Sequence, residues 1–167
     1  MIKGKGYGGC WPTPEQEFLL RACILTGDKA ADAYLKWKSS ADMERVDPGS
    51  YRLFPLLYMN LISEGVDDPL MNIFRCVYIR TRENNGTLYG RLSKLLAGLN
   101  GRGMPVILLK GAALALLYYG DYGLRPMMDA DMLIPVNRVR EAIDIITELG
   151  WRPSITPLKG FSDMKLL

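Results

Sequence analysis

Apolar residues recur at helical spacing through the first hundred residues of the chain. The segment Thr13-Pro14-Glu15-Gln16 combines an N-cap threonine, a proline at the first helical position and a glutamine three residues after the cap. It predicts a helix from about residue 14 to residue 26. A second helix is indicated by four apolar residues at the spacing i, i+3, i+4 and i+7, namely Ala30, Ala33, Tyr34 and Trp37.

The third predicted helix follows Pro48-Gly49-Ser50, which we interpret as a break between helices. Pro55 lies in the first turn of this helix or kinks it, because proline lacks a backbone N–H and clashes with the preceding turn. One face of the helix carries three leucines, Leu53, Leu57 and Leu61.

The longest predicted helix opens at Pro69. Its apolar face is formed by Ile73, Phe74, Val77, Leu88, Leu92, Leu95 and Leu99. Asn84-Asn85-Gly86 is a possible interruption, since glycine in a helix interior costs about 1 kcal/mol relative to alanine. Gly101-Arg102-Gly103 ends the helical part, so residues 1–102 form a predicted helical bundle.

The hydrophobic pattern changes at Met104. Five further elements are expected: a buried strand over residues 106–109, a helix over 112–117, a strand over 129–134, an amphipathic helix over 136–150 and a strand from about Trp151. This order predicts an α+β fold, in which the helical bundle precedes a small α/β-type unit with a mixed sheet over residues 103–167.

The composition excludes several classes of protein. The chain has 167 residues, 49% hydrophobic and 23% charged, as in globular proteins and unlike collagen-like or disordered chains. No stretch approaches roughly eighteen uninterrupted apolar residues, so we expect neither export nor membrane insertion. Cys10, Cys23 and Cys76 lack zinc-site spacing and are odd in number, which favours a reducing cytoplasm.

Charge and the absence of histidine narrow the chemistry further. The formal net charge of +3 is too small to indicate a nucleic-acid binder without a local basic patch. The chain contains no histidine, which excludes Ser-His-Asp and Cys-His catalysis and zinc sites that need histidine. Any catalysis must therefore use carboxylates, lysine, arginine and metal ions.

The strongest candidate chemistry lies at Asp129 and Asp131, which open an apolar run. Residues two apart in a strand point to the same side, about 6.5 Å apart, so both carboxylates are expected to face one pocket. That arrangement suits two divalent cations acting on a phosphoryl group. Lys110-Gly111 follows the preceding strand, where glycine lets a phosphate approach the main chain and lysine adds a positive charge. Arg125 offers a fork of donors that suits a triphosphate.

Each of these signals has an ordinary structural alternative. Lys110-Gly111 alone is more often a solvated lysine before a turn glycine, the aspartates alone could be solvated turn residues, and Arg125 could pair with Asp121. All of these features in this order are harder to produce by chance: a phosphate-binding turn, a helix, a loop with an arginine, and paired carboxylates that open an apolar strand. The order also disfavours haloacid-dehalogenase-type phosphatases, in which the apolar strand precedes the aspartates. A metal-dependent glycosyltransferase is a weaker alternative, because only one strand precedes the pair.

Taken together, these residues resemble the uncharacterised nucleotidyltransferase family of the polymerase-β-like superfamily. The resemblance is carried by residues 108–114, 119, 125–135 and 149–151, with residues 11–12 and 52–58 upstream. It implies that the chain transfers a nucleoside monophosphate from an NTP to an acceptor hydroxyl. It also implies that Asp129 and Asp131 hold Mg²⁺, with two ions expected, and that Lys110, Gly111 and Arg125 bind the phosphates.

The chain departs from the superfamily pattern in two places. Lys110-Gly111 stands where the superfamily usually has Gly-Gly or Gly-Ser. The superfamily also brings a third carboxylate from a later strand, and Asp163 is the candidate, because it is the only acidic residue after Gly150. Family members generally continue beyond this point, so we expect the catalytic core of this chain to be incomplete at its C-terminus.

Two other functions stay open. The chain could be a non-catalytic module with a nucleotidyltransferase-like fold that binds nucleotide or a partner. The long helix also carries residues suited to a polyanion, namely Arg75, Tyr78, Arg80, Arg82, Tyr89, Arg91 and Lys94. Their spacing spreads them around the helix, so they give no strong nucleic-acid signal. Fold-level similarity does not predict whether the acceptor is a small molecule, a peptide or protein, or RNA.

Overall fold

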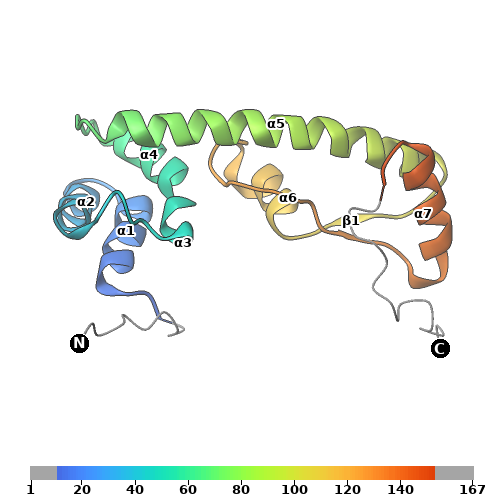
Figure 1. Cartoon of the computed structure of the whole chain (residues 1–167), viewed down its shortest axis with the longest axis horizontal. Helices are drawn as coiled ribbons and strands as arrows, with labels where there is room; N and C mark the ends of the chain where they lie inside the picture. Colours follow the sequence, from blue (N-terminus) through green and yellow to red (C-terminus); the bar gives the residue numbers. More distant parts are fainter. Residues whose placement is uncertain (1–10, 153–167) are drawn as a thin grey trace.

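A 31-residue helix, α5 (Met71–Gly101), connects two groups of shorter elements that pack along one side of it (Figure 1). The computed structural model describes residues 11–152. These residues are mostly helical and contain one two-stranded antiparallel sheet, so the predicted α+β class is confirmed. In the described residues, none of the helices combines the length and apolar character that a membrane span requires.

Three helices form the group beside the first half of α5. The helix α4 (Phe54–Ser63) packs directly against α5, α1 (Pro14–Ile24) packs against α4 and α2 (Asp28–Ser40), and Trp37 of α2 reaches Phe74 of α5. The predicted capping box of α1 is confirmed. The backbone N–H of Gln16 donates to Thr13 Oγ1 at 3.2 Å, and the backbone N–H of Thr13 donates to Gln16 Oε1 at 3.0 Å. Pro55 lies in the first turn of α4, where its missing N–H removes no helical hydrogen bond.

These helices enclose what we call the first cluster. Its buried residues are Leu19, Ala22, Cys23, Ala33, Tyr34, Trp37, Phe54, Leu57, Leu61, Phe74 and Val77. Four aromatic rings lie at its centre, with the Phe54 and Phe74 centroids 4.9 Å apart and Trp37 5.8 Å from Phe54. Edge-to-face pairs of this kind add about 0.5–1.5 kcal/mol beyond the area that they bury.

The segment before α4 is not the simple break that the sequence predicts. Residues Pro48–Tyr51 form a short helix, α3. The Asp47 side chain accepts hydrogen bonds from the backbone N–H groups of Gly49 at 2.9 Å and Ser50 at 3.1 Å. A proline at the first position and an aspartate N-cap together stabilise a helical turn that the proline-glycine pair alone argues against.

The predicted interruption of the long helix is also wrong, because α5 runs through Asn84-Asn85-Gly86. Asn85 is fully buried, and Gly86 faces solvent. Most of the stability of a helix in a protein comes from tertiary packing, which here outweighs the poor helix propensity of the segment.

The second group of elements lies along the rest of α5 (Figure 1). It consists of β1 (Ile107–Leu108), α6 (Lys110–Leu114), a π-helical turn η1 (Ala115–Tyr119), β2 (Met132–Leu133), a 3₁₀ turn η2 (Val136–Arg138) and α7 (Val139–Glu148). The helix α6 lies beside the middle of α5, and α7 packs against its last turns. The strands pair with Ile107 opposite Leu133 and Leu108 opposite Met132. The strand predicted from Trp151 falls largely outside the described residues.

Both strands are shorter than the sequence predicts. The buried residues of this half form the second cluster, Leu95, Leu99, Met104, Ala142 and Ile145. Two of them come from α5 and two from α7. The cluster therefore holds α7 and the inner face of the two-stranded sheet against α5. The helix α5 contributes to both clusters.

Candidate functional site

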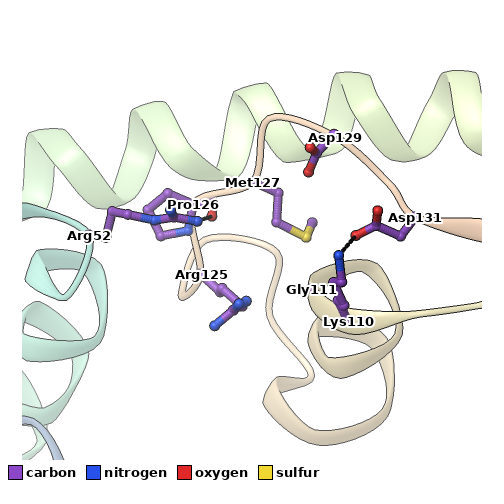
Figure 2. Close-up of a pocket in the computed structure, with 8 residues that line it drawn as sticks. All are labelled: Arg52, Lys110, Gly111, Arg125, Pro126, Met127, Asp129 and Asp131. Atoms are coloured by element: carbon purple, nitrogen blue, oxygen red, sulfur yellow. Dashed lines mark hydrogen bonds and ion pairs between the residues drawn. The ribbon is translucent and has the colours of Figure 1, made fainter. Parts of the chain in front are cut away.

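A pocket of about 210 Å³ opens beside the middle of α5 (Figure 2). Its lining residues are Arg52, Lys110, Gly111, Arg125, Pro126, Met127, Asp129 and Asp131. The structure therefore brings together five of the six residues that the sequence analysis selects. The sixth, Asp163, lies outside the described residues.

The two carboxylates lie in the loop that leads into β2, and not within the strand as predicted. The backbone N–H of Leu109 donates to the carbonyl of Asp131 at 2.9 Å, which continues the ladder by one residue. Pairing stops there because the partner segment turns into α6 at Lys110. Both carboxylates nevertheless turn toward the space between the loop and the start of α6 (Figure 2).

Lys110 occupies an unusual backbone position and pairs with a candidate metal ligand. Its φ angle is +51°, a left-handed conformation that costs a non-glycine residue roughly 1–2 kcal/mol. Its Nζ lies 3.1 Å from Asp131 Oδ2. The side chains are 73% and 41% exposed, and ion pairs of this kind contribute at most about 1 kcal/mol. The pair therefore leaves Asp131 accessible to a competing cation.

Gly111 allows α6 to approach the loop closely. A methyl group at this position would lie 3.1 Å from Met127 Sδ and 3.3 Å from Arg125 Nε. The sequence analysis explains Gly111 by the close approach of a phosphate to the main chain. The structure gives it a packing role as well, because a larger side chain would push the loop away from α6.

Arg125 brings a donor into the same space. Its Nε is buried and has no hydrogen-bond partner among residues 11–152. A buried donor without a partner is costly in a folded protein. The guanidinium of Arg125 also lines the pocket, where its positive charge suits an anion.

Arg52 is a pocket residue to which the sequence analysis assigns no role. It follows α3 at the corner before α4, and its Nη2 donates to the carbonyl of Pro126 at 3.3 Å. With Lys110 and Arg125 it gives the pocket three cationic side chains. No local pattern marks Arg52 as a site residue, because only the packing of the α3–α4 corner brings it to the loop at Pro126.

Asn85 is the second residue that the sequence analysis missed. Its Nδ2 donates to the carbonyl of Tyr122 at 2.6 Å and to that of Arg125 at 2.8 Å. Its Oδ1 accepts from the backbone N–H of Met127 at 3.3 Å. The sequence does indicate that Asn85 faces the interior. It lies three residues before Leu88 and seven before Leu92, and therefore on the buried face of the helix.

Two tyrosines of α5 also form hydrogen bonds around the pocket, one with the loop after η1 and one with α6. Tyr78 Oη donates to Asp121 Oδ2 at 2.7 Å, and this bond raises the pKa of Tyr78. Tyr89 Oη donates to the carbonyl of Ala112 at 2.7 Å, and burial raises the pKa of Tyr89. Both hydroxyls therefore stay protonated, as donors, at neutral pH.

The pocket fits a metal ion that shares its ligands with a substrate better than a closed metal site. Over residues 11–152, no cluster of three or more Asp, Glu, Cys or His side chains is placed to bind a metal ion. Asp129 and Asp131 supply hard oxygen ligands from one loop. Mg²⁺ commonly binds through one or two carboxylates together with substrate phosphates, which matches this donor set.

Comparison with known proteins gives one match. The family model described as uncharacterised nucleotidyltransferase matches residues 50–162, more than half of the chain and every residue that lines the pocket. No curated protein and no solved structure matches the chain.

Proposed function

The chain belongs to the uncharacterised nucleotidyltransferase family, and on that basis we propose that it transfers a nucleoside monophosphate from an NTP to an acceptor hydroxyl with the help of Mg²⁺. The observation that carries the proposal is the pocket itself, which combines two carboxylates on one loop with three cationic side chains. A magnesium–triphosphate complex presents both a cation and an excess of negative charge, so it requires both kinds of group. The second group of elements then forms a small polymerase-β-like core.

In this proposal Asp129 and Asp131 hold Mg²⁺, with room for a second ion shared with the phosphates. When bound, the metal neutralises charge on the phosphoryl oxygens and orients them for in-line displacement. Asp131 must exchange its contact with Lys110 to act as a ligand. The exposed lysine side chain can then turn to a phosphate oxygen, which keeps both charges paired.

The arginines bind the remaining charge of the triphosphate. Arg125 has a buried donor available, and its planar fork suits two oxygens of one phosphate. Arg52 reaches the pocket from the first group of helices, so that group contributes to substrate binding.

Transfer forms a bond between the acceptor oxygen and the α-phosphorus and breaks the bond from that phosphorus to the β-phosphate bridge. Pyrophosphate leaves, and the proton of the acceptor hydroxyl passes to a base. Asp163 is the proposed base or third metal ligand. The acceptor is a small molecule, a peptide or protein, or RNA.

The test uses NTPs labelled at the α-phosphate, Mg²⁺ and candidate acceptors from these three classes. We expect labelling by the wild type and a loss of at least a hundredfold with Asp131→Asn. Asp144→Asn is the matched control, because Asp144 is an exposed carboxylate of α7 that does not line the pocket. Equal labelling by Asp131→Asn and Asp144→Asn contradicts the assignment.

A non-catalytic binding module is the second candidate. One observation favours it, since the pocket of the described chain offers only two carboxylates. Binding of NTP that depends on Mg²⁺ and on Asp131, without transfer to any acceptor class, selects this alternative.

A cytoplasmic location and a division of the chain into residues 1–102 and 103–167 belong to the proposal as well. Both cysteines in the described part are free thiols, as expected in a reducing compartment. The helix α5 ends at Gly101, where the chain turns toward β1, although its last turns pack against the second group. Limited proteolysis that cuts first near residue 102 would support the boundary.

A further inference from the structure

The face of α5 that looks toward the pocket carries polar residues in place of leucine. Tyr78, Asn85 and Tyr89 are spaced by seven and four residues, so they lie along one side of the helix. Each of them hydrogen-bonds to a different part of the chain around the pocket. This row of side chains forms a polar stripe between the two hydrophobic clusters.

Asn85 lies at the centre of the stripe, and its side-chain amide forms hydrogen bonds with one loop. Its two N–H donors and its carbonyl oxygen serve the backbone of Tyr122, Arg125 and Met127. The side chain is fully buried. Removing any of these partners would leave a buried polar group unsatisfied, so the loop conformation and the asparagine depend on each other.

Tyr89 fixes the opposite wall of the pocket relative to the same helix. Its hydroxyl donates to the carbonyl of Ala112, the residue after Gly111. Its ring also stacks on Tyr122, with centroids 4.7 Å apart and an interplanar angle of 30°. The start of α6 and the start of the loop are therefore both attached to α5 at points one turn apart.

Two further hydrogen bonds reach the loop from outside α5: Arg52 Nη2 donates to the carbonyl of Pro126 at 3.3 Å, and the backbone N–H of Leu109 donates to the carbonyl of Asp131 at 2.9 Å. Met128 is 97% exposed, and Asp129 is exposed as well. Gly123 packs against the Tyr78 ring, where any side chain would clash. Asn85 makes three of the four hydrogen bonds that reach residues 122–127 from other parts of the described chain, so it has the largest share in placing the loop that carries Arg125, Asp129 and Asp131.

We propose that Asn85 is a positioning residue of this site, which sets the placement of the loop that carries Arg125, Asp129 and Asp131. The inference rests on the proposed function for what the loop binds. A leucine would continue the apolar face of α5 without the cost of burying an amide. The asparagine is therefore better explained by the loop that it holds than by the stability of the helix.

The test compares Asn85→Leu with Thr81→Val. Thr81 is the buried polar residue one turn earlier on α5, and its hydroxyl makes no hydrogen bond to the loop within the described residues. The probe is an equimolar mixture of the four labelled NTPs in excess Mn²⁺, and the NTP bound to the protein is measured by equilibrium dialysis. We expect Asn85→Leu to bind at least tenfold more weakly than Thr81→Val, with both variants folded by circular dichroism.

Hydrogen exchange supplies a readout that needs no nucleotide. The amide of Met127 loses its acceptor in Asn85→Leu and should exchange at least tenfold faster than in Thr81→Val, while the amides of α2 exchange equally in both. If Asn85→Leu does not fold, Asn85→Asp carries the same expectation for Mn²⁺–NTP affinity, because it keeps the shape and loses the two amide donors. It keeps an oxygen that accepts from the amide of Met127, so the amide whose exchange should change in this variant is not that of Met127.

The outcomes separate the inference from the proposed function. If Asn85→Leu and Thr81→Val show equal Mn²⁺–NTP affinity and equal exchange at Met127, the positioning role is overturned. If wild type and Asp131→Asn bind Mn²⁺–NTP equally, the proposed function fails, and the exchange measurement still decides whether Asn85 holds the loop.

Discussion

The first cluster contains eleven buried residues, four of them aromatic, whereas the second contains five and none of them is aromatic. The first cluster is enclosed by three helices and half of α5, so its interior is covered on all sides by the chain itself. Both halves expose some large apolar side chains, such as Leu35 at 61% and Leu117 at 76%, so the contrast lies in the size and aromatic content of the two clusters. The two halves of the described chain therefore differ in how their geometry is maintained.

The difference shows that stability and site geometry come from separate sets of contacts. In the first half, apolar packing determines the structure. In the second half, hydrogen bonds from Tyr78 and Asn85 hold the pocket loop, and a hydrogen bond from Tyr89 holds α6. Since α5 takes part in both, damage to the first cluster should reach the pocket through the helix, whereas damage to the pocket should leave the first cluster folded.

The largest expected effect comes from opening the first cluster. Phe54 is 1% exposed and packs against Phe74 and Trp37. Replacing a buried phenylalanine by alanine removes its transfer free energy and leaves a cavity, so Phe54→Ala should lower the free energy of unfolding by about 3–5 kcal/mol. Urea denaturation followed by far-UV circular dichroism measures this loss.

The matching variant in the second half is Leu117→Ala, which removes a side chain that faces solvent. Its free energy of unfolding should stay within about 0.5 kcal/mol of the wild type. A loss below 1 kcal/mol for Phe54→Ala, or a loss for Leu117→Ala as large as that for Phe54→Ala, would break the comparison between the first cluster and the exposed apolar side chains of the second half.

The five helices of ten or more residues in the described chain follow from the sequence because periodicity and capping are local. Thr13 and Gln16 mark the start of α1, and the spacing of Ala30, Ala33 and Trp37 defines α2. The errors lie where a distant or unexpected partner decides. The short helix α3 needs the Asp47 cap. The continuity of α5 through Asn85 depends on packing against a loop about forty residues later.

The candidate site was predictable to the same degree. Lys110, Asp129 and Asp131 could be placed in one pocket because a strand, a turn and a second strand bring them together within one short stretch of chain. Arg52 and Asn85 could not, since their distance from the loop is set by how α4 and α5 pack. Periodicity identifies a buried face but does not show which residues that face contacts.

A medium effect is expected where the first group of helices meets the pocket. The hydrogen bond from Ser50 lowers the pKa of Asp47, which caps the short helix that ends beside Arg52. Loss of an aspartate cap costs about 1 kcal/mol, so Asp47→Ala should reduce the free energy of unfolding by that amount at pH 7. Denaturant unfolding at several pH values measures both the loss and its pH dependence.

The sign of the pH dependence follows from the lowered pKa. The contribution of Asp47 is fully present above the ordinary aspartate pKa of about 3.9 and is lost as the pH falls through the lower pKa of the folded protein. The difference between wild type and Asp47→Ala should therefore shrink below about pH 4. A difference that stays constant down to pH 2 would show that the carboxylate of Asp47 is not what stabilises α3.

The last prediction concerns Lys110, where two variants separate the effect of backbone strain from the effect of charge within the pocket. Lys110→Gly relieves the left-handed backbone, whereas Lys110→Ala keeps it, and both remove the ammonium that lies beside Asp131. We expect Lys110→Gly to be more stable than Lys110→Ala by about 1 kcal/mol in urea denaturation.

Both Lys110 variants should bind Mn²⁺ alone about two- to fivefold more tightly than the wild type, since an exposed ion pair worth up to about 1 kcal/mol no longer competes for Asp131. Both should bind Mn²⁺–NTP less tightly, because the phosphates lose a cation. Equal stability of the two variants would mean that the strain at residue 110 is not real. Unchanged Mn²⁺ affinity would mean that Lys110 and a metal ion do not share Asp131, and the proposed exchange between them would have to be abandoned.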